Sequence, residues 1–388
     1  MENLPSEIIA NVQHYLTNLE LSAHQRSERR FNISLSHPDI LYRKYHNVDL
    51  WYVSIMGNLE GVMYLVANGA DVSKNNNSVL RGSAKYGQLN VVKYLIERGI
   101  NSYINDALML ASTKGHLDVV KYLIENGANN HIDDDLILRE ASVNGYLPII
   151  QYLVERGADI DNNKDYMLRI ASTKGYLDIV KYTIEHRANI HTYNDEPLSS
   201  ASMNGHLEIV IYLISNGANI QAVNDFIIIW TCRNKHLDVV RYLTEHGASL
   251  NADTELAFRE ACQNGNLEIA LFLVEHGANI HIDNGGALDS ALRNGHLNVV
   301  KFLVECGLRI EDDCALSNAS ASGYFDIVQY LVEHGANIHW NNNFALKEVY
   351  RMRRFNKSTT GRHHLQKMII NRSYNAIAHY LIEHGAKS

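Results

Sequence analysis

Apolar residues recur along the chain with a helical period, and the whole pattern returns about every 30 residues. In one copy, Leu117, Val120 and Leu123 share one helix face, and Gly127 follows where a left-handed residue ends a helix. The same position holds Gly69, Gly99, Gly127, Gly157, Arg187, Gly217, Gly247, Gly277, Gly307, Gly335 and Gly385. The steps are 28 or 30 residues, except for a last step of 50. This spacing predicts about eleven copies of one unit, stacked as a solenoid.

A shorter helix is predicted before the apolar one in each unit. Leu108, Ala111 and Ser112 lead to Lys114-Gly115, where small residues permit close helix approach and the glycine allows a tight turn. Polar turn-forming residues separate the units, for example Asp133-Asp134-Asp135 and Asn162-Asn163. The chain is therefore predicted to be all-α and built from helix-turn-helix repeats, with acidic tips that favour a basic or hydrogen-bonding partner surface.

The phrase from Asn204-Gly205-His206-Leu207 to Asn216-Gly217-Ala218-Asn219-Ile220, preceded by Pro197-Leu198, resembles the ankyrin repeat. The resemblance covers residues 48–388 and implies an ankyrin-type solenoid of about 11 repeats. The unit is about three residues shorter than the usual 33, so short fingers are expected. Such short units are also similar to the ankyrin families of mimivirus-type giant DNA viruses, which would place the protein in a host cytoplasm.

Two units depart from the pattern. Arg187 stands where a left-handed glycine is expected, and Lys235 replaces the glycine of the turn inside a unit, next to the bulky run from Phe226 to Trp230. A left-handed backbone costs a non-glycine residue about 1 kcal/mol. The solenoid is therefore expected to be kinked or loosened at both places.

Residues 1–47 do not follow the repeat, and two interpretations of them stay open. They contain an apolar helical face that begins at a proline, which fits a cap on the end of the stack. The pattern is also similar to the first helix of an F-box, the module that docks on the linker subunit of cullin-type ubiquitin ligases, although the rest of that motif is absent. The residues that carry the F-box resemblance are Leu4, Pro5, Glu7, Ile8, Ile9, Val12 and Leu16.

A basic insert lengthens the last unit at about residues 344–372, with eight Lys or Arg residues and one glutamate. One interpretation is a solvated loop, or helices that cover the open end of the stack. The alternative is a surface for an acidic protein, an import receptor or a nucleic acid. Nucleic acid is the less favoured partner, because base recognition needs more than basic charge and the whole chain has a formal charge of -8.

Composition and motifs argue against an enzyme or a metalloprotein. No phosphate-binding loop, His-Glu-x-x-His pair or Gly-x-Ser-x-Gly elbow occurs, and no apolar run is long enough to span a membrane. Most of the 20 histidines occupy repeated positions one unit apart, too far apart to share a metal ion. Cys232, Cys262, Cys306 and Cys314 are interpreted as reduced structural thiols. The prediction is a soluble intracellular protein without catalytic residues, cofactor or metal.

The resemblance to ankyrin proteins implies a non-enzymatic scaffold that binds a protein partner through its concave face. Partners of that family are held by finger tips and by the solvent-facing ends of the first helices. The residues chosen at those ends, one in each repeat, are Tyr86, Lys114, Asn144, Lys174, Met203, Arg233, Gln263 and Arg293. An adaptor that recruits a ubiquitin ligase through residues 4–16, and a nucleic-acid-associated protein that acts through the basic insert, are the alternatives.

Overall fold

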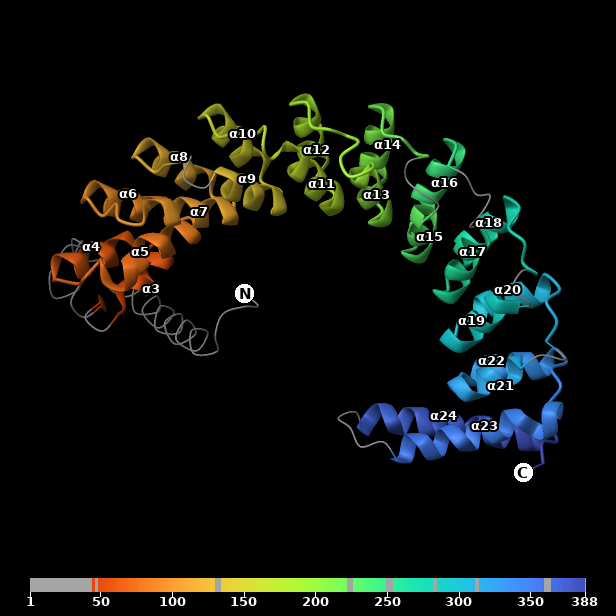
Figure 1. The fold of residues 1–388 in the computed structure, drawn as a ribbon. Helices are drawn as coiled ribbons and strands as arrows, with labels where there is room; N and C mark the ends of the chain where they lie inside the picture. The colour runs from red at the N-terminus through yellow and green to blue at the C-terminus, as the bar shows by residue number, and fades with distance from the viewer. Residues whose placement is uncertain are drawn as a thin grey trace, which may run out of the picture. The chain divides into compact units, whose positions relative to one another are not determined.

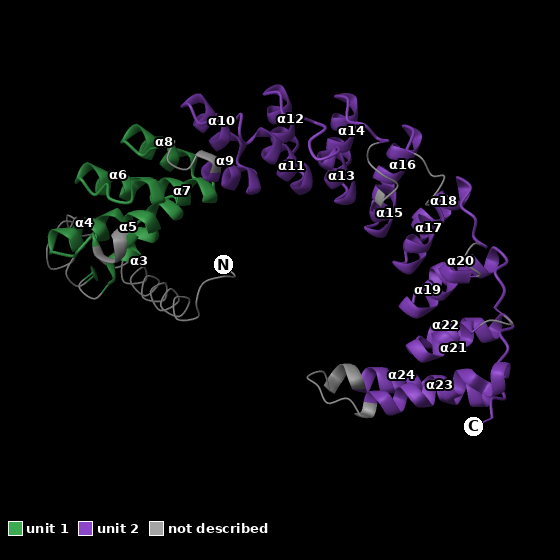
Figure 2. Cartoon of the chain, in the orientation of Figure 1, with its two compact units in different colours: residues 1–130 green, residues 131–388 purple. Residues whose placement is uncertain are grey.

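The computed structural model describes residues 44–45, 48–129, 134–221, 226–248, 254–281, 285–310, 314–358 and 364–387. These ranges contain 22 helices in sequence, and no strand occurs among the residues described. The helices alternate as a first and a second helix of each repeat, which gives the predicted eleven pairs. The chain divides into two compact units, residues 1–130 and residues 131–388 (Figure 2).

The first unit contains three helix pairs. They are α3 (Leu50–Ile55) with α4 (Leu59–Ala67), α5 (Lys74–Lys85) with α6 (Leu89–Glu97), and α7 (Ile104–Lys114) with α8 (Leu117–Glu125).

The second unit contains eight pairs. They are α9 (Asp134–Val143) with α10 (Leu147–Glu155), α11 (Lys164–Lys174) with α12 (Leu177–Glu185), α13 (Glu196–Met203) with α14 (Leu207–Ser215), α15 (Phe226–Arg233) with α16 (Leu237–Glu245), α17 (Thr254–Gln263) with α18 (Leu267–Glu275), α19 (Gly286–Asn294) with α20 (Leu297–Glu305), α21 (Ala315–Ser322) with α22 (Phe325–Glu333), and α23 (Trp340–Ser358) with α24 (His364–Glu383).

Each second helix buries its apolar stripe and ends at the predicted left-handed residue. In α8, Val120 and Leu123 are fully buried, and burial of one such side chain stabilises the fold by about 1.5–3 kcal/mol. The Gly127 amide donates to the Ile124 carbonyl at 3.2 Å, and the Ala128 amide donates to the Leu123 carbonyl at 2.9 Å. Gly127 has φ +94°, so the helix ends in a Schellman motif that satisfies its last carbonyls.

Consecutive first helices pack more closely than consecutive second helices in both units. Ala111 and Ser112 of α7 are fully buried in this packing, and the first helices α3 to α21 keep a small residue at one or both of these positions. Closer packing on one side makes each stack curve toward that side. Within the second unit, α9, α11, α13, α15, α17 and α19 line the inner side of the curve, as Figure 1 shows. The ends of the first helices therefore face the concave side.

In several repeats a histidine before the second helix joins the repeat to the preceding one, and a tyrosine ring takes the same place in others. His206 Nε2 donates to the Thr173 carbonyl at 3.1 Å, and its ring lies against the turn glycine Gly175. A Cβ atom on Gly175 would lie 2.7 Å from His206 Cε1, and the residue has φ +84°. This turn therefore requires glycine for two reasons. The same contact joins His116 to Lys85 at 3.0 Å and His296 to Gln263 at 2.9 Å.

A second set of histidines ends the second helices: His186, His246, His276, His334 and His384. Each Nδ1 donates to the carbonyl four residues earlier at 2.8 Å. Each ring also lies 3.9–4.2 Å from the aromatic ring at that earlier position. These histidines therefore cap helices, as expected from the favourable dipole at a helix C-terminus.

The two irregular positions have different consequences. Arg187 and Lys235 both adopt the left-handed backbone of the glycines they replace, with φ 61° and 72°. The repeat that contains Lys235 is loosened on one side only: α13 and α15 pack less closely than any other consecutive first helices of the second unit, whereas α15 and α17 pack as closely as regular pairs. The expectation was wrong for Arg187, because α11 and α13 pack as closely as regular pairs. Arg187 is exposed at the helix end, and a Cβ at the equivalent Gly127 or Gly217 would meet nothing within 4 Å.

The basic insert is helical wherever the structure describes it, which confirms the helical form of the first interpretation. It lengthens both helices of the last pair, although Asn341, Asn342 and Asn343 near the start of α23 have left-handed backbone, and Figure 1 shows both helices extending past the ends of α21 and α22. The Tyr374 hydroxyl anchors α24 by donating to the Ala321 carbonyl of α21 at 2.8 Å.

The F-box-like residues 4–16 lie outside the described residues. Among the helices that are described, none is long and apolar enough to cross a membrane.

Candidate partner-binding face

The eight residues predicted to contact a partner lie at the C-terminal ends of eight consecutive first helices, α5 to α19. Tyr86, Lys114, Lys174, Arg233 and Arg293 are exposed, whereas the other three are half-buried. The set occupies two adjacent positions. Tyr86, Lys114, Asn144 and Lys174 directly precede the turn residue of their repeat, and Met203, Arg233, Gln263 and Arg293 lie one residue earlier.

The three half-buried residues also have roles within the fold. The Asn144 amide donates to the Glu140 carbonyl at 2.7 Å and so caps its own helix. The Met203 carbonyl accepts from Asn234 Nδ2 at 2.7 Å, and the Gln263 carbonyl accepts from His296. The polar side chain of Asn144 is therefore less available to a partner than those of Lys114 and Lys174.

The two arginines of the set are held in place by neighbouring side chains. The Arg233 guanidinium lies 4.7 Å from the Trp230 ring, and its Nε is 3.9 Å from a Glu260 carboxylate oxygen of the next repeat. Arg293 Nε donates to Asp289 at 2.8 Å within α19. Trp230 and Arg233 are both partly exposed, so they present an aromatic and cationic surface at the loosened step.

One hollow on this face lies in the first unit. A groove of about 370 Å³ is lined by Trp51, Ser78, Arg81, Gly82, Lys85, Tyr86 and Leu110, from the three first helices α3, α5 and α7. Gly82 occupies a helical position that Leu110 fills in the next repeat. The missing side chain opens the groove and admits the Trp51 ring, whose Nε1 would lie 3.0 Å from a Cβ on Gly82.

The groove combines apolar walls with two cations. Arg81 Nε lies 3.7 Å from an Asp106 carboxylate oxygen and makes no hydrogen bond within the described structure. Lys85 Nζ lies 5.6 Å from the centre of the Tyr86 ring. This arrangement suits a ligand that places an apolar side chain beside a carboxylate, because Arg and Lys donate hydrogen bonds to that group.

A second hollow of about 540 Å³ adjoins this groove on the finger side. Its lining includes Trp51 and Ser78, which it shares with the groove, together with Asp49, Ala70 and Asp71. Asp49 accepts from the Trp51 amide at 2.7 Å, and Asp71 accepts from the Ser73 amide at 2.8 Å, so both carboxylates already order the local backbone. Trp51 therefore stands between a cationic and an acidic hollow.

Sequence reasoning identified Tyr86 at this site but missed Trp51, Arg81 and Leu110. These residues lie within the first helices, whereas the residues predicted to bind a partner lie at the helix ends. The available indication was Gly82, since no other first helix places glycine at that position.

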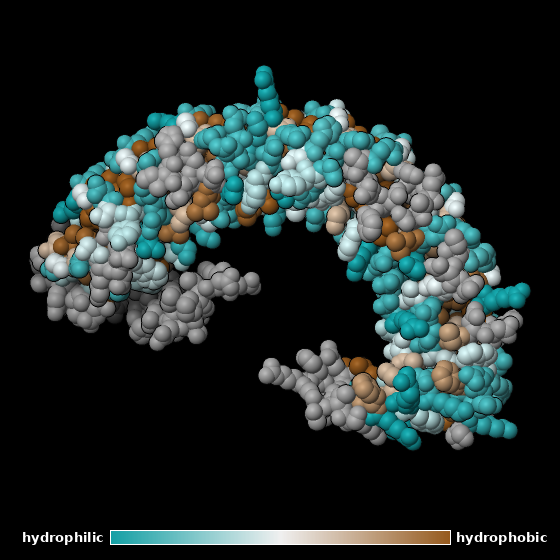
Figure 3. Space-filling model, in the orientation of Figure 1, coloured by the Kyte–Doolittle hydropathy of each residue, from teal (hydrophilic) through white to brown (hydrophobic). Residues whose placement is uncertain are grey.

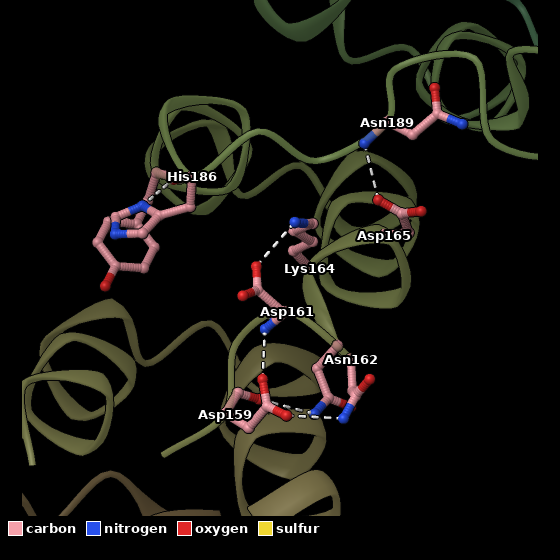
Figure 4. A network of polar contacts seen from close by, with 9 residues as sticks. Asp159, Asp161, Asn162, Lys164, Asp165, His186 and Asn189 are labelled. Atoms are coloured by element: carbon pink, nitrogen blue, oxygen red, sulfur yellow. Dashed lines mark hydrogen bonds and ion pairs between the residues drawn. The ribbon is translucent and has the colours of Figure 1, made fainter. Parts of the chain in front are cut away.

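The finger carboxylates are largely used inside the fold (Figure 4). Asp159 accepts from the Asp161 amide at 2.8 Å, and Lys164 Nζ pairs with Asp161 at 2.8 Å, which lowers the pKa of that carboxyl. Asp165 accepts from the Asn189 amide of the next finger at 2.7 Å. These fingers therefore offer a partner fewer free carboxylates than the sequence suggested. Asp133, Asp134 and Asp135 have no described side chains.

The four cysteines are free thiols, as predicted. Burial raises the pKa of Cys232 and of Cys262 to about 12, which makes both thiols unreactive in the folded protein. Among the described residues, no group of three or more His, Cys, Asp or Glu side chains is arranged to hold a metal ion.

Stacked helix pairs that present aromatic and cationic side chains on a concave face define a repeat protein of the macromolecule-binding class. The family model described as ankyrin repeats in three copies matches residues 50–134, 138–224, 220–284 and 283–343. These matches cover well over half of the chain, and the chain belongs to the ankyrin-repeat family. Ankyrin repeats generally mediate protein–protein interactions, and proteins built from them are typically non-enzymatic scaffolds.

Among solved structures, the chain is similar to the crystal structure of the human ASB11 ankyrin repeat domain, with 25% sequence identity and a TM-score of 0.40. The similarity covers 44% of this chain and 84% of that chain. No curated protein matches the sequence.

Proposed function

We propose that the protein is a scaffold that binds a partner polypeptide along the solvent-facing side of its first helices, with the Trp51–Tyr86–Leu110 groove as the main anchor. The observation that carries this proposal is the groove itself, in which three apolar side chains surround the space above Gly82 and two cations border it. Tryptophan, tyrosine and arginine are the residues most often found at binding hot spots.

A protein partner is favoured over the other classes by the shape and charge of this face. The groove is open and shallow, whereas small-molecule sites enclose most of their ligand. The chain has a formal charge of -8, which opposes general binding to nucleic acid. An extended or helical segment with an apolar residue next to an aspartate or glutamate fits the groove best.

The chain offers a matched pair of variants for the test. Lys85-Tyr86 ends the first helix α5, and the same dipeptide, Lys93-Tyr94, lies in the second helix α6 of the same repeat. The full-length protein, Lys85→Ala/Tyr86→Ala and Lys93→Ala/Tyr94→Ala would each be used for affinity capture from cell lysate with quantitative mass spectrometry. A captured protein would then be purified for measurement of its Kd with the three proteins.

The Lys85→Ala/Tyr86→Ala variant is expected to bind a purified partner with a Kd about thirtyfold higher. This is the change that a loss of about 2 kcal/mol at a hot spot implies. The Lys93→Ala/Tyr94→Ala variant should bind within about twofold of the unchanged protein, because most contacts outside a hot spot matter little. Equal loss in both variants, or no loss in either, would show that the groove does not anchor the partner.

The N-terminal segment supports a second proposal, in which Leu4, Pro5, Ile8, Ile9 and Leu16 dock on a ubiquitin-ligase linker subunit and the first helices present a target. The resemblance to giant-virus ankyrin families supports a host cytoplasm as the place of action. Full-length protein and an Ile8→Glu/Ile9→Glu variant would be tested for capture of the recombinant linker subunit. Capture by the full-length protein and not by the variant is expected; absence of capture by both would leave residues 1–47 as a cap.

A further inference from the structure

A row of asparagines follows the inner side of the second unit. Four consecutive repeats place asparagine directly before their turn residue, at the C-terminal ends of the first helices α13, α15, α17 and α19: Asn204, Asn234, Asn264 and Asn294. We call these four residues the amide row. Their helices line the inner side of the curve in Figure 1, and Figure 3 shows mainly hydrophilic atoms on this edge over α17 and α19.

The fold holds each amide of the row by one hydrogen bond. Nδ2 of Asn204, Asn264 and Asn294 donates to the carbonyl four residues earlier in the same helix at 2.8–2.9 Å. Asn234 Nδ2 donates instead to the Met203 carbonyl of the preceding first helix at 2.7 Å. In the described part of the chain, none of the four Oδ1 atoms accepts a hydrogen bond. Each amide therefore keeps an acceptor oxygen and a second N–H for a ligand.

The spacing of the row selects the conformation of a bound chain. Consecutive helices in contact lie about 8–10 Å apart. A polyproline II segment has three residues per turn and rises about 3.1 Å per residue, so it presents the same face about every 9 Å. A β-strand instead turns to the other face with each residue, and an α-helix uses its backbone groups internally. A polyproline II chain therefore offers one free backbone group to each amide of the row.

Cations accompany the row although the whole chain is acidic. Lys174 of α11, Arg233 of α15 and Arg293 of α19 are exposed on every second first helix. At the positions one, two, five and six residues before the turns that follow α9 to α19, six residues are Lys or Arg and three are Asp or Glu, whereas the chain has a formal charge of -8. This surface complements a segment with spaced carboxylates. Glu260 and Asp289 beside the two arginines disfavour the dense charge of a nucleic acid.

We propose that the amide row binds an acidic segment of a partner protein in the polyproline II conformation. The amides would hydrogen-bond backbone groups of every third residue, and Arg233 and Arg293 would bind carboxylates about six residues apart. Trp230, which is 37% exposed beside Arg233, offers its ring to a proline of the segment. The proposal rests on the proposed function of the first helices as a binding face and names the class of ligand for the second unit.

The probe for the test is a fluorescent peptide of five Glu-Pro-Pro triplets, which repeats a carboxylate and a backbone N–H every third residue. A block peptide of the same composition, with all glutamates before all prolines, has the same charge without that period. Fluorescence anisotropy would measure the Kd of both peptides with the full-length protein. The row variant is Asn204→Ala/Asn264→Ala, and the charge variant is Arg233→Ser/Arg293→Ser.

The second helices supply matched controls. Nδ2 of Asn126 and of Asn216 makes the same bond to the carbonyl four residues earlier, at 2.8 Å, at the ends of α8 and α14. Asn126→Ala/Asn216→Ala therefore removes two equivalent caps outside the row. Arg98→Ser/Arg241→Ser removes two exposed arginines, one after α6 and one in α16. Circular dichroism and urea unfolding of each variant would check that its fold and stability match those of its control.

The triplet peptide is expected to bind about tenfold more tightly than the block peptide. The row and charge variants should each lose about tenfold in affinity for it, the effect of removing two hydrogen-bonding side chains, and the controls should bind within about twofold. Equal binding of the two peptides, or equal losses in the row variant and its control, would overturn the proposal, because charge or stability would then explain the result. Tighter binding of single-stranded RNA, with loss in the same variants, would overturn it in favour of that ligand.

The Lys85→Ala/Tyr86→Ala variant separates this proposal from the proposed function. It should bind the triplet peptide within about twofold of the unchanged protein, because the groove belongs to the first unit. If the triplet peptide does not bind while this variant still loses its purified partner, the amide row is not the site and the proposed function stands. If the peptide binds through the row while the variant keeps its partner, the row is supported and the groove fails as the main anchor.

Discussion

Two steps of the second unit join neighbouring repeats at the same position but with different residues. At the regular step, the His206 ring lies against Gly175, and its Nε2 reaches the Thr173 carbonyl. At the step from α15 to α17, Lys235 replaces the glycine, and the smaller Asn266 stands where His206 stands in the regular step. Asn266 Nδ2 still donates to a carbonyl of the preceding first helix, that of Cys232, at 2.6 Å.

The comparison indicates that the turn residue and the residue that contacts it are matched in size. A glycine turn leaves room for an imidazole ring, whereas the Cβ of Lys235 would occupy that room. The shorter amide of Asn266 keeps the hydrogen bond to the preceding helix without the ring. Asn266 is nearly fully buried, so loss of this bond would leave a polar group in the interior.

The largest expected effect follows from filling the space at the regular step. Gly175→Ala should destabilise the protein by about 2–4 kcal/mol, because a left-handed alanine costs about 1 kcal/mol and the Cβ overlaps the His206 ring. Gly217→Ala is the matched control, since Gly217 has φ +100° and a Cβ there meets nothing within 4 Å. This variant should lose only about 1 kcal/mol of unfolding free energy, measured by urea unfolding followed by circular dichroism. Equal losses would show that the ring contact contributes nothing.

The second prediction exchanges the two residues that meet at the step from α15 to α17. Asn266→His should destabilise the protein by about 2 kcal/mol, because the ring would collide with the Lys235 side chain. Lys235→Gly removes both the collision and the left-handed strain, so the double variant should recover the loss. A double-mutant cycle from urea unfolding should give a coupling energy above about 1 kcal/mol. Additive effects would mean that the two positions are not matched.

The repeat pattern was enough to predict most of the fold, because its apolar positions lie on local helices that the sequence specifies directly. The helix ends at Gly127 and Arg187, the eleven pairs and the loosened step near Lys235 were all foreseeable. The contact between His206 and Gly175 was not, because it joins residues from neighbouring repeats. The groove above Gly82 was missed for the same reason: its walls come from three separate first helices.

The third prediction removes the hydrogen bond of a regular step while leaving the glycine in place. His206→Ala should cost about 1–1.5 kcal/mol, since the Thr173 carbonyl loses its donor and the ring its packing. His206→Asn should cost about half as much, because Asn266 shows that an amide in this position reaches the preceding helix. Urea unfolding of the two variants would measure the difference. A greater loss with asparagine than with alanine would contradict the assigned role of the side chain.

The smallest expected effect concerns local opening beside the loosened step. Cys232 of α15 and Cys262 of α17 occupy equivalent positions, are fully buried and have pKa values raised by burial to about 12. Their intrinsic thiolate fractions at pH 8 are therefore alike, so a difference in alkylation rate reports how often each helix opens. Because α15 packs loosely on α13, Cys232 should react about two- to fivefold faster than Cys262. This ratio corresponds to a free energy of local opening that is about 0.5–1 kcal/mol lower for α15 than for α17.

Iodoacetamide labelling followed by peptide mass spectrometry would measure both rates, with the exposed Cys314 as the fast reference. Raising the pH by one unit should increase the rates of Cys232 and Cys262 by the same factor, because both thiols regain the ordinary cysteine pKa once their helix has opened. The ratio of the two rates should then stay constant, which separates helix opening from thiol chemistry. In urea the ratio should fall to one. Equal rates in the native protein would mean that the weaker packing of α13 on α15 does not lower the local stability of α15.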